Sequence, residues 1–147
     1  EVRVDDVIVD AMMAHVVRDP VKFDVIVTTN MFGDILSDLT AELSGSLGMG
    51  GSLNAGIDHA MGQAAHGSAP DIAGQDIANP FSLVLSAAML LRWHAQRISH
   101  VAFANAAAAI DAAVAHCVVT GQSTRDVGGQ LGTRATGQAV IAQLNKA

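Results

Sequence analysis

Two aspartates, Asp34 and Asp38, lie four residues apart directly after a short apolar run. If a helix begins near Gly33, both carboxylates project from one face of that helix, within its first turn or so. Like charges this close repel, and a divalent cation such as Mg²⁺ or Mn²⁺ would relieve the repulsion while leaving positions for substrate oxygens, such as those of a 2-hydroxy acid. The alternative is that both aspartates are solvated and bind no metal, since aspartate is common near a helix N-terminus. The four-residue spacing alone favours this alternative.

A second candidate site is the segment His66–Pro80, HGSAPDIAGQDIANP. Its glycines allow close backbone approach and Ser68 adds a hydroxyl, so the segment could hold a pyrophosphate without any lysine. Asp71 can accept hydrogen bonds from both hydroxyls of an adenosine ribose, and its charge would repel a 2′-phosphate, which favours NAD over NADP. Asn79 offers a donor and an acceptor for the adenine edge. An irregular glycine turn before a helix-starting proline is the alternative.

Composition excludes several classes of function. The 147 residues carry a net charge of −6 with only 8 Lys and Arg, so the sequence predicts neither a nucleic-acid-binding surface nor a membrane-binding one. The single cysteine, Cys117, allows no intrachain disulfide and no zinc framework, which favours a reducing compartment, the cytoplasm. The apolar run over residues 101–120 is interrupted by polar residues and indicates a packed helix rather than a membrane span.

Periodicity predicts the elements that would position these groups. A β-branched run at residues 23–29 is typical of a buried strand, and the glycine-rich residues 44–56 indicate a loop or short strand near a domain hinge. Apolar spacing and turn residues predict helices over residues 7–18, about 33–43, 80–96, 101–119 and 133–144. The expected fold class is α/β, mostly helical with a few strands.

Three segments together resemble the β-decarboxylating dehydrogenases, the isopropylmalate, isocitrate and tartrate dehydrogenase family. They are Asn30–Asp38 after its Val-Ile-Val-Thr-Thr run, Val9–His15, and His66–Pro80. The resemblance implies an isopropylmalate dehydrogenase-like fold, of which the chain would be a C-terminal fragment. Residues 1–45 would then belong to the central dimerisation and metal-binding domain, and residues 46–147 to the C-terminal part of the cofactor-binding domain.

The resemblance also implies a set of site residues and a cytoplasmic homodimer with two shared active sites. Asp10 would join Asp34 and Asp38 as a metal ligand, would contact the substrate, and would serve the site of the neighbouring subunit. Mg²⁺ or Mn²⁺ would be the metal and NAD the cofactor. The implied cofactor-binding residues are His66, Gly67, Ser68, Ala69, Pro70, Asp71, Ile72 and Asn79. Asp126–Gly129 resembles a later family segment near the adenine pocket, although a tight turn explains it almost as well.

The reaction implied by the family is oxidation of a 2-hydroxy dicarboxylate, such as 3-isopropylmalate or tartrate, followed by loss of CO₂. Family members use a lysine and a tyrosine to move protons, but this sequence has no tyrosine and neither of its two lysines can be assigned that role. We therefore expect these groups upstream and the 147 residues alone to be inactive. Gln63-Ala64-Ala65 replaces the Glu-Pro pair of many members and leaves the substrate open. A non-catalytic nucleotide-binding or regulatory subunit of the same fold, and a helical domain without a ligand, are the alternatives.

Overall fold

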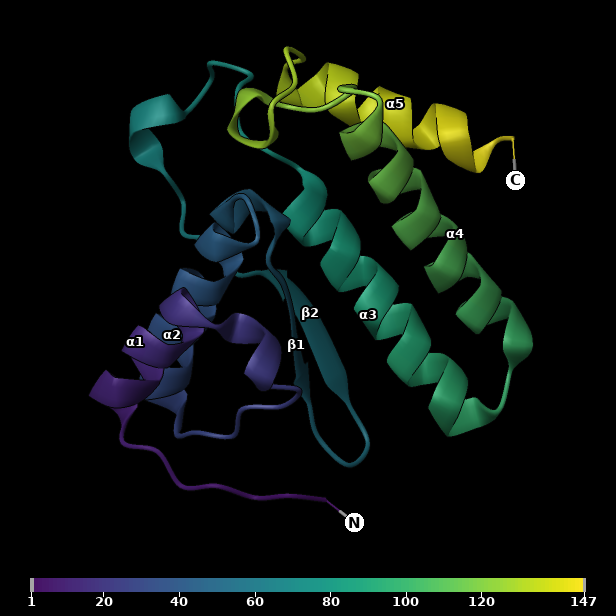
Figure 1. Cartoon of the computed structure of the whole chain (residues 1–147). Helices are drawn as coiled ribbons and strands as arrows, with labels where there is room; N and C mark the ends of the chain where they lie inside the picture. The colour runs from purple at the N-terminus through teal and green to yellow at the C-terminus, as the bar shows by residue number, and fades with distance from the viewer. Residues whose placement is uncertain (1, 147) are drawn as a thin grey trace.

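The computed structural model describes residues 2–146, which form five α-helices, four short 3-10 turns and one β-hairpin (Figure 1). The α-helices are α1 (Val9–Arg18), α2 (Asn30–Leu43), α3 (Phe81–Ile98), α4 (Val101–Val119) and α5 (Thr133–Leu144). The 3-10 turns are η1 (Pro20–Lys22), η2 (Leu47–Met49), η3 (Pro70–Ile72) and η4 (Arg125–Val127). The strands are β1 (Gly51–Ala55) and β2 (Ala60–Ala64).

The long helix α3 is the centre of the arrangement. It lies antiparallel to α4 on one side and contacts the β-hairpin on the other, while α5 crosses the end of α4 (Figure 1). The turn between α3 and α4 is tight because Ser99 adopts a left-handed conformation with φ of 50° and closes α3. The buried core where α3, α4 and α5 meet consists of Phe81, Ala113, Val114, Cys117, Ala139 and Val140.

Small polar residues attach the β-hairpin to α3. Strands β1 and β2 pair antiparallel, with Leu53 opposite Gly62. The fully buried Ser86 accepts a hydrogen bond from Ser52 N at 3.0 Å and donates to Gln63 O at 2.6 Å. A Cβ added to Gly62 would lie 2.8 Å from Ser86 O, so only glycine permits this approach. Serine hydrogen bonds and close backbone contact therefore fix the hairpin against α3.

The predicted strand at residues 23–29 is wrong for this structure. Residues 24–29 adopt no regular secondary structure, and Val25 and Val27 are 81% and 91% exposed. A strand needs a neighbour to pair with, and within residues 2–146 the only sheet is the two-stranded β1–β2 hairpin. Residues 23–29 therefore have the β-branched composition of a strand, but no strand among the described residues lies beside them to pair with.

The bounds of α1 and α3 agree with the prediction to within two residues, and two larger differences occur elsewhere. Helices α4 and α5 have the predicted bounds, and the glycine-rich run contains β1. Helix α2 begins at Asn30 rather than near Gly33, and strand β2 was not predicted, because its Ala-Met-Gly-Gln-Ala sequence has little β-propensity.

Helix α4 is long and apolar enough to cross a bilayer by length and composition alone. Its buried residues, among them Ala107, Val114 and Cys117, face the helical packing, and Asp111 forms an ion pair with Arg92 of α3. The packing against α3 and α5 gives part of this apolar helix a place in the core.

Candidate dinucleotide site

A cavity of about 750 Å³ lies between the His66–Asn79 loop and the segments around η4 and the start of α5. A ligand pocket for a nucleotide-sized molecule has this order of volume. The residues that line it come from four parts of the chain: Leu47 and Gly48; His66, Gly67, Ser68, Ala69, Ile72, Ala73, Gly74, Asp76, Ile77, Ala78 and Asn79; Arg125 and Asp126; and Thr133 and Arg134.

The loop wall of the cavity has an unusual backbone. Ala69 and Asp76 have φ of 41° and 57°, a left-handed conformation that non-glycine residues rarely adopt, and Gly74 has φ of 77°. Ala69 directly precedes Pro70, the first residue of η3, so the chain reverses there and brings residues on both sides of η3 to the cavity. His66 Nδ1 lies 2.9 Å from Gly67 O, which fixes the ring beside the start of the loop.

Asp76 joins this loop to the start of α5. Its side chain accepts a hydrogen bond from Arg134 N at 3.0 Å, and its carbonyl accepts one from Thr133 N at 2.9 Å. Thr133 Oγ1 also donates to Ala78 O at 2.5 Å. A Cβ on Gly132 would lie 2.5 Å from Asp76 Oδ2, so the contact requires glycine there. Hydrogen bonds therefore join the His66–Asn79 wall of the cavity directly to the wall formed by the start of α5.

Asp126 is the second junction between the walls. Its Oδ2 accepts hydrogen bonds from Ser46 Oγ at 2.5 Å and Asn79 Nδ2 at 2.8 Å, and its Oδ1 accepts one from Thr124 Oγ1 at 2.5 Å. Partial burial would raise the pKa of the Asp126 carboxyl, but these three donors outweigh it and hold the pKa below its ordinary value. The carboxylate therefore stays ionised and ties η2, the start of α3 and η4 together.

The structure brings six of the eight predicted cofactor residues to the cavity. They are His66, Gly67, Ser68, Ala69, Ile72 and Asn79. Pro70 and Asp71, both in η3, are not among the lining residues; Asp71 is exposed, and its carbonyl accepts a hydrogen bond from Gln75 Nε2 at 2.8 Å. The ribose role of Asp71 stays a prediction.

The side chain of Asn79 is already engaged within the protein. It is 9% exposed, its Oδ1 accepts from Phe81 N at 2.9 Å at the start of α3, and its Nδ2 donates to Asp126. Gly48 packs against it so closely that a Cβ there would lie 2.7 Å from Asn79 Cβ. Asn79 therefore shapes the cavity, and its second amide hydrogen, the second lone pair of its Oδ1 and its backbone are left for reading an adenine edge.

The predicted metal residues lie on α1 and α2. Because α2 begins at Asn30, Asp34 and Asp38 lie in its second and third turns. The positive end of the helix dipole therefore stabilises their negative charges less than it would in the first turn, where the sequence predicted them. Both are exposed, and Asp34 Oδ2 accepts only a long hydrogen bond, 3.4 Å from Asn30 Nδ2. Their spacing still places the two carboxylates on one helix face.

Asp10 lies in the first turn of α1, where its Oδ1 accepts a hydrogen bond from Ala11 N at 2.8 Å. Within residues 2–146, no three His, Cys, Asp or Glu side chains come together closely enough to hold a metal ion. If Asp10 binds the metal of a neighbouring subunit, it need not lie close to Asp34 and Asp38 of its own chain. The metal set stays a prediction.

Sequence reasoning missed the opposite wall of the cavity. Arg125, Thr133 and Arg134 line it, although nothing in their local sequence marks them as ligand residues. The resemblance at Asp126–Gly129 was the one available signal, and it could not be separated from a tight turn. These residues lie some fifty positions from the His66–Asn79 loop, and only the packing of α5 and η4 beside that loop reveals them.

A mostly helical fold with one β-hairpin and a cavity beside its glycine-rich loop is what the geometry defines, and similarity to known proteins specifies the family. The model of the isocitrate/isopropylmalate dehydrogenase family matches residues 1–142. The chain belongs to this family.

Its relatives include enzymes with several substrates. A 3-isopropylmalate dehydrogenase from Hahella chejuensis is 49% identical over 98% of this chain, and a homoisocitrate dehydrogenase from Methanocaldococcus jannaschii is 42% identical over 99% of it. In both cases the chain spans 40% of the relative's length.

Similar solved structures belong to dehydrogenases of the same family. Isocitrate dehydrogenase from Methylococcus capsulatus superposes with a TM-score of 0.86 at 42% identity, covering 95% of this chain and 40% of that one. The apo form of a β-decarboxylating dehydrogenase from Thermococcus kodakarensis gives a TM-score of 0.78 at 39% identity, covering 99% of this chain and 41% of that one. The isopropylmalate dehydrogenase-like fold predicted from the sequence is confirmed.

Proposed function

We propose that the chain is the C-terminal part of an NAD-dependent, Mg²⁺- or Mn²⁺-requiring enzyme that oxidatively decarboxylates a 2-hydroxy dicarboxylate. The observation that carries the proposal is the cavity of about 750 Å³, walled by six of the eight residues expected to hold the cofactor. Backbone amides of its glycine-rich loop would bind phosphate oxygens, and its volume suits the adenosine half of a dinucleotide.

The chain's own residues have distinct tasks in this proposal. Backbone groups of Gly67 and Ser68 would bind the cofactor phosphates, and the apolar side of Ile72 would pack on the adenosine. The carboxylates of Asp34 and Asp38 are exposed on one face of α2, and their hard oxygens fit a divalent metal. When bound, NAD supplies the hydride acceptor and the metal supplies the Lewis acid.

In this proposal, the groups that transfer protons lie outside these 147 residues. The sequence has no tyrosine, Lys22 forms an ion pair with Asp19 at 2.9 Å, and Lys146 lies at the end of the chain. We therefore propose that the chain alone is catalytically inactive and that a lysine and a tyrosine come from other parts of the complete protein. In this proposal the enzyme acts in the cytoplasm.

The activity test uses the complete protein that contains this chain. It is incubated with NAD and Mn²⁺, and with 3-isopropylmalate, isocitrate, homoisocitrate or tartrate in turn, while NADH and CO₂ are measured. We expect both products with at least one substrate. Absence of both products with all four substrates, from a protein that still binds NAD, would instead favour the non-catalytic subunit.

The proposed homodimer can be tested through its shared sites. Asp10→Asn and Asp34→Asn should each inactivate the enzyme, because each removes a ligand from both sites. Subunits of the two variants mixed at equal ratio and reassembled should regain about one quarter of wild-type activity, since about half the dimers are mixed and each has one intact site. If both variants are inactive and mixtures that form mixed dimers show no recovery, Asp10 acts within its own subunit. An Asp10→Asn variant that keeps its activity would show that Asp10 has no role at the site.

A further inference from the structure

The short segment between α2 and the β-hairpin is hydrogen-bonded on both sides. The Ser46 hydroxyl, in a residue that is 6% exposed, donates to Asp126 Oδ2 and also accepts from Gly48 N at 3.0 Å. Leu47 N donates to Glu42 Oε2 at 3.1 Å, across the end of α2. The segment is therefore attached to the cavity through Asp126 and to α2 through Glu42.

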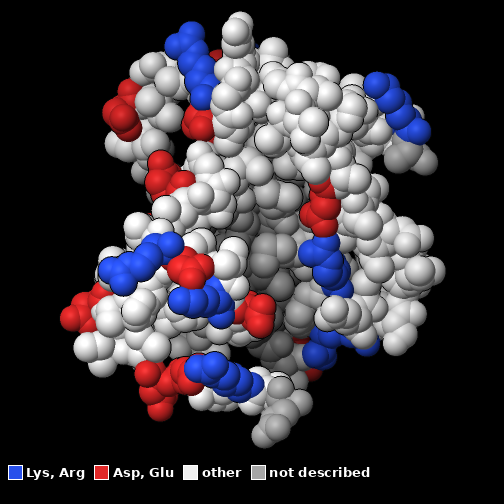
Figure 2. Space-filling model, viewed as in Figure 1, with Lys and Arg blue, Asp and Glu red and all other residues white. Residues whose placement is uncertain are grey.

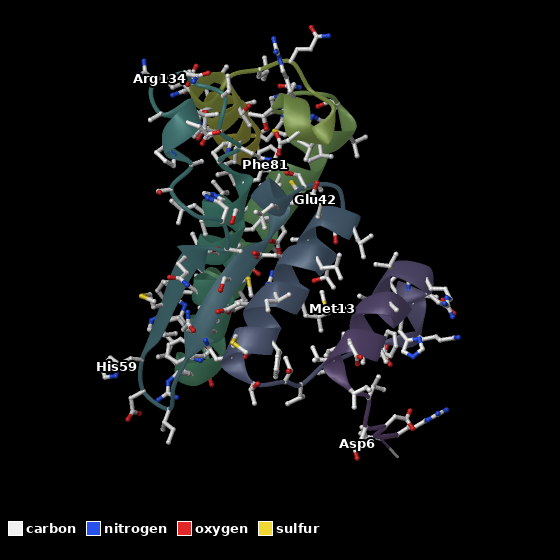
Figure 3. All side chains as sticks on the ribbon, turned by 90° about the vertical axis from the view of Figure 1, so that its left-hand side faces the viewer. Asp6, Met13, Glu42, His59, Phe81 and Arg134 are labelled. Atoms are coloured by element: carbon white, nitrogen blue, oxygen red, sulfur yellow. The ribbon has the colours of Figure 1, made fainter. Side chains whose placement is uncertain are left out.

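Glu42 continues the helix face that carries the predicted metal ligands. It lies four residues after Asp38, which lies four residues after Asp34, so the three carboxylates follow one another along one face of α2. Figure 3 shows Glu42 at the end of α2 that lies on the same side of the molecule as Phe81, the first residue of α3. The bond from Leu47 N to Glu42 therefore connects this helix face directly to the η2 segment.

The backbone next to Ser46 has room to turn. Gly45 has φ of 131°, and a Cβ added to it would have no atom within 4 Å. Within residues 2–146, the four ion pairs join other parts of the chain and none involves α2. Figure 2 shows charged side chains scattered over the visible face rather than gathered into opposed patches. The bonds of Ser46 and Glu42 therefore restrain a point at which α2 could otherwise turn relative to the cavity.

We propose that Ser46 is a positioning residue that sets the metal-binding face of α2 relative to the cofactor cavity. Ser46 does not itself line the cavity; it acts through Asp126 on the cavity side, and through Leu47 and Glu42 on the α2 side. The inference rests on the proposed function and adds to it a residue that touches neither substrate nor cofactor.

The proposed reaction explains why such positioning would affect the rate. A hydride moves from the hydroxyl-bearing carbon of the substrate to NAD, and the hydroxyl proton leaves to a base outside these residues. The reacting atoms must lie about 3–3.5 Å apart, and a misplacement of about 1 Å can slow such a step about a hundredfold. A turn of α2 at Gly45 would move the metal-bound substrate and leave the cofactor in place, so it should slow hydride transfer more than it weakens NAD binding.

Four substitutions in the complete protein separate positioning from a general structural role. Ser46→Ala removes the bond to Asp126 from the segment after α2. Thr124→Val is the matched control, because Thr124 Oγ1 also donates to Asp126 but belongs to the N-terminal end of η4. Glu42→Ala breaks the bond on the α2 side, at an exposed residue whose loss should not prevent folding, and Glu42→Gln keeps an acceptor oxygen for Leu47 N.

The first measurement is single-turnover NADH formation at saturating Mn²⁺, with the substrate that turns over. We expect Ser46→Ala and Glu42→Ala to slow it by about tenfold or more, while the NAD concentration that gives half the maximal rate changes less than about threefold. Thr124→Val and Glu42→Gln should slow it by less than about twofold. Rescue by Glu42→Gln would show that the hydrogen bond, and not the negative charge of Glu42, sets the rate.

Hydrogen–deuterium exchange of the unliganded protein gives a second readout that needs no activity. Residues 45–49 should exchange at least about fivefold faster in Ser46→Ala than in Thr124→Val or the wild type, because Gly48 N–H loses its acceptor. The inference is overturned if Ser46→Ala and Thr124→Val behave alike in both measurements, or if Ser46→Ala transfers hydride at the wild-type rate. A wild-type protein that forms no NADH with any of the four substrates would refute the proposed function, and this positioning role with it.

Discussion

Removing the Asp126 carboxylate should destabilise the protein substantially. Three donors converge on it, and two of them, Ser46 and Thr124, are 6% and 0% exposed. A hydrogen bond to a charged group contributes about 1.5–3 kcal/mol to the free energy of unfolding. Because solvent partly screens the Asp126 carboxylate, we assign about 1 kcal/mol to each of its three hydrogen bonds. Asp126→Ala breaks all three bonds and leaves buried donors unpaired, so we expect a loss of about 3 kcal/mol. Asp126→Asn keeps an acceptor oxygen and should lose only about 1 kcal/mol.

Urea unfolding of the complete protein at pH 7, followed by circular dichroism, measures these losses. Asp24→Ala is the control, since Asp24 is exposed and makes no side-chain hydrogen bond within the described residues; we expect a change within about 0.5 kcal/mol. In a double-mutant cycle, Ser46→Ala and Asp126→Ala should couple by about 1 kcal/mol. Additive losses, or an Asp126→Ala variant as stable as the control, would refute the view that this carboxylate joins the cavity walls.

The stabilising effect of Asp126 should also depend on pH in a defined direction. Its pKa in the folded protein lies below the ordinary value of 3.8, so its stabilisation is fully present above that value and is lost as pH falls through the lowered pKa. The stability difference between wild type and Asp126→Asn should thus stay constant from pH 7 to about 5 and shrink only below about 4. A difference that already shrinks near pH 6 would contradict the assignment.

Three further substitutions test separate parts of the molecule. Gly129→Ala should lower the free energy of unfolding by about 3 kcal/mol or more, because the added Cβ would lie 1.9 Å from the backbone oxygen of Ser123. The same urea unfolding measures this loss, and a loss below about 1 kcal/mol would show that the turn relaxes to make room for the methyl group. Asp34→Asn should abolish turnover and weaken Mn²⁺ binding by about tenfold or more in calorimetry while leaving NAD binding intact, and retained activity at ordinary Mn²⁺ would remove Asp34 from the metal site. Asp71→Lys should shift the NADP/NAD ratio of kcat/KM toward NADP by about tenfold; an unchanged ratio is the outcome that would deny Asp71 a role at the ribose.

Local sequence signals predicted what local forces determine. Helix α4 has the expected bounds because its alanine-rich sequence is intrinsically helical, and α3 starts after Pro80 because proline suits that position. Helix α2 begins before the predicted start because Gly33 is accommodated inside the helix, where its N–H donates to Thr29 O at 2.8 Å.

Features that depend on long-range contacts could not be predicted from the sequence. The His66–Asn79 loop was identified from its own residues, but the opposite wall comes from η4 and α5, which chain packing alone brings to the loop. Asn79 illustrates the same limit: its amide was expected to face a ligand, and its partners Asp126 and Phe81 N determine its orientation instead. The predicted strand at residues 23–29 does not form for the same reason, since no strand among the described residues pairs with it.

The unpaired segment around Val25 and Val27 has a consequence for solubility. Within residues 2–146, no backbone group of residues 24–28 has a backbone hydrogen-bond partner, and the stretch from Val25 to Thr29 is uncharged and rich in β-branched side chains. Such a segment is a template for intermolecular strand pairing. The 147 residues expressed alone should therefore self-associate, and Val27→Lys should keep them in solution longer without altering the cavity.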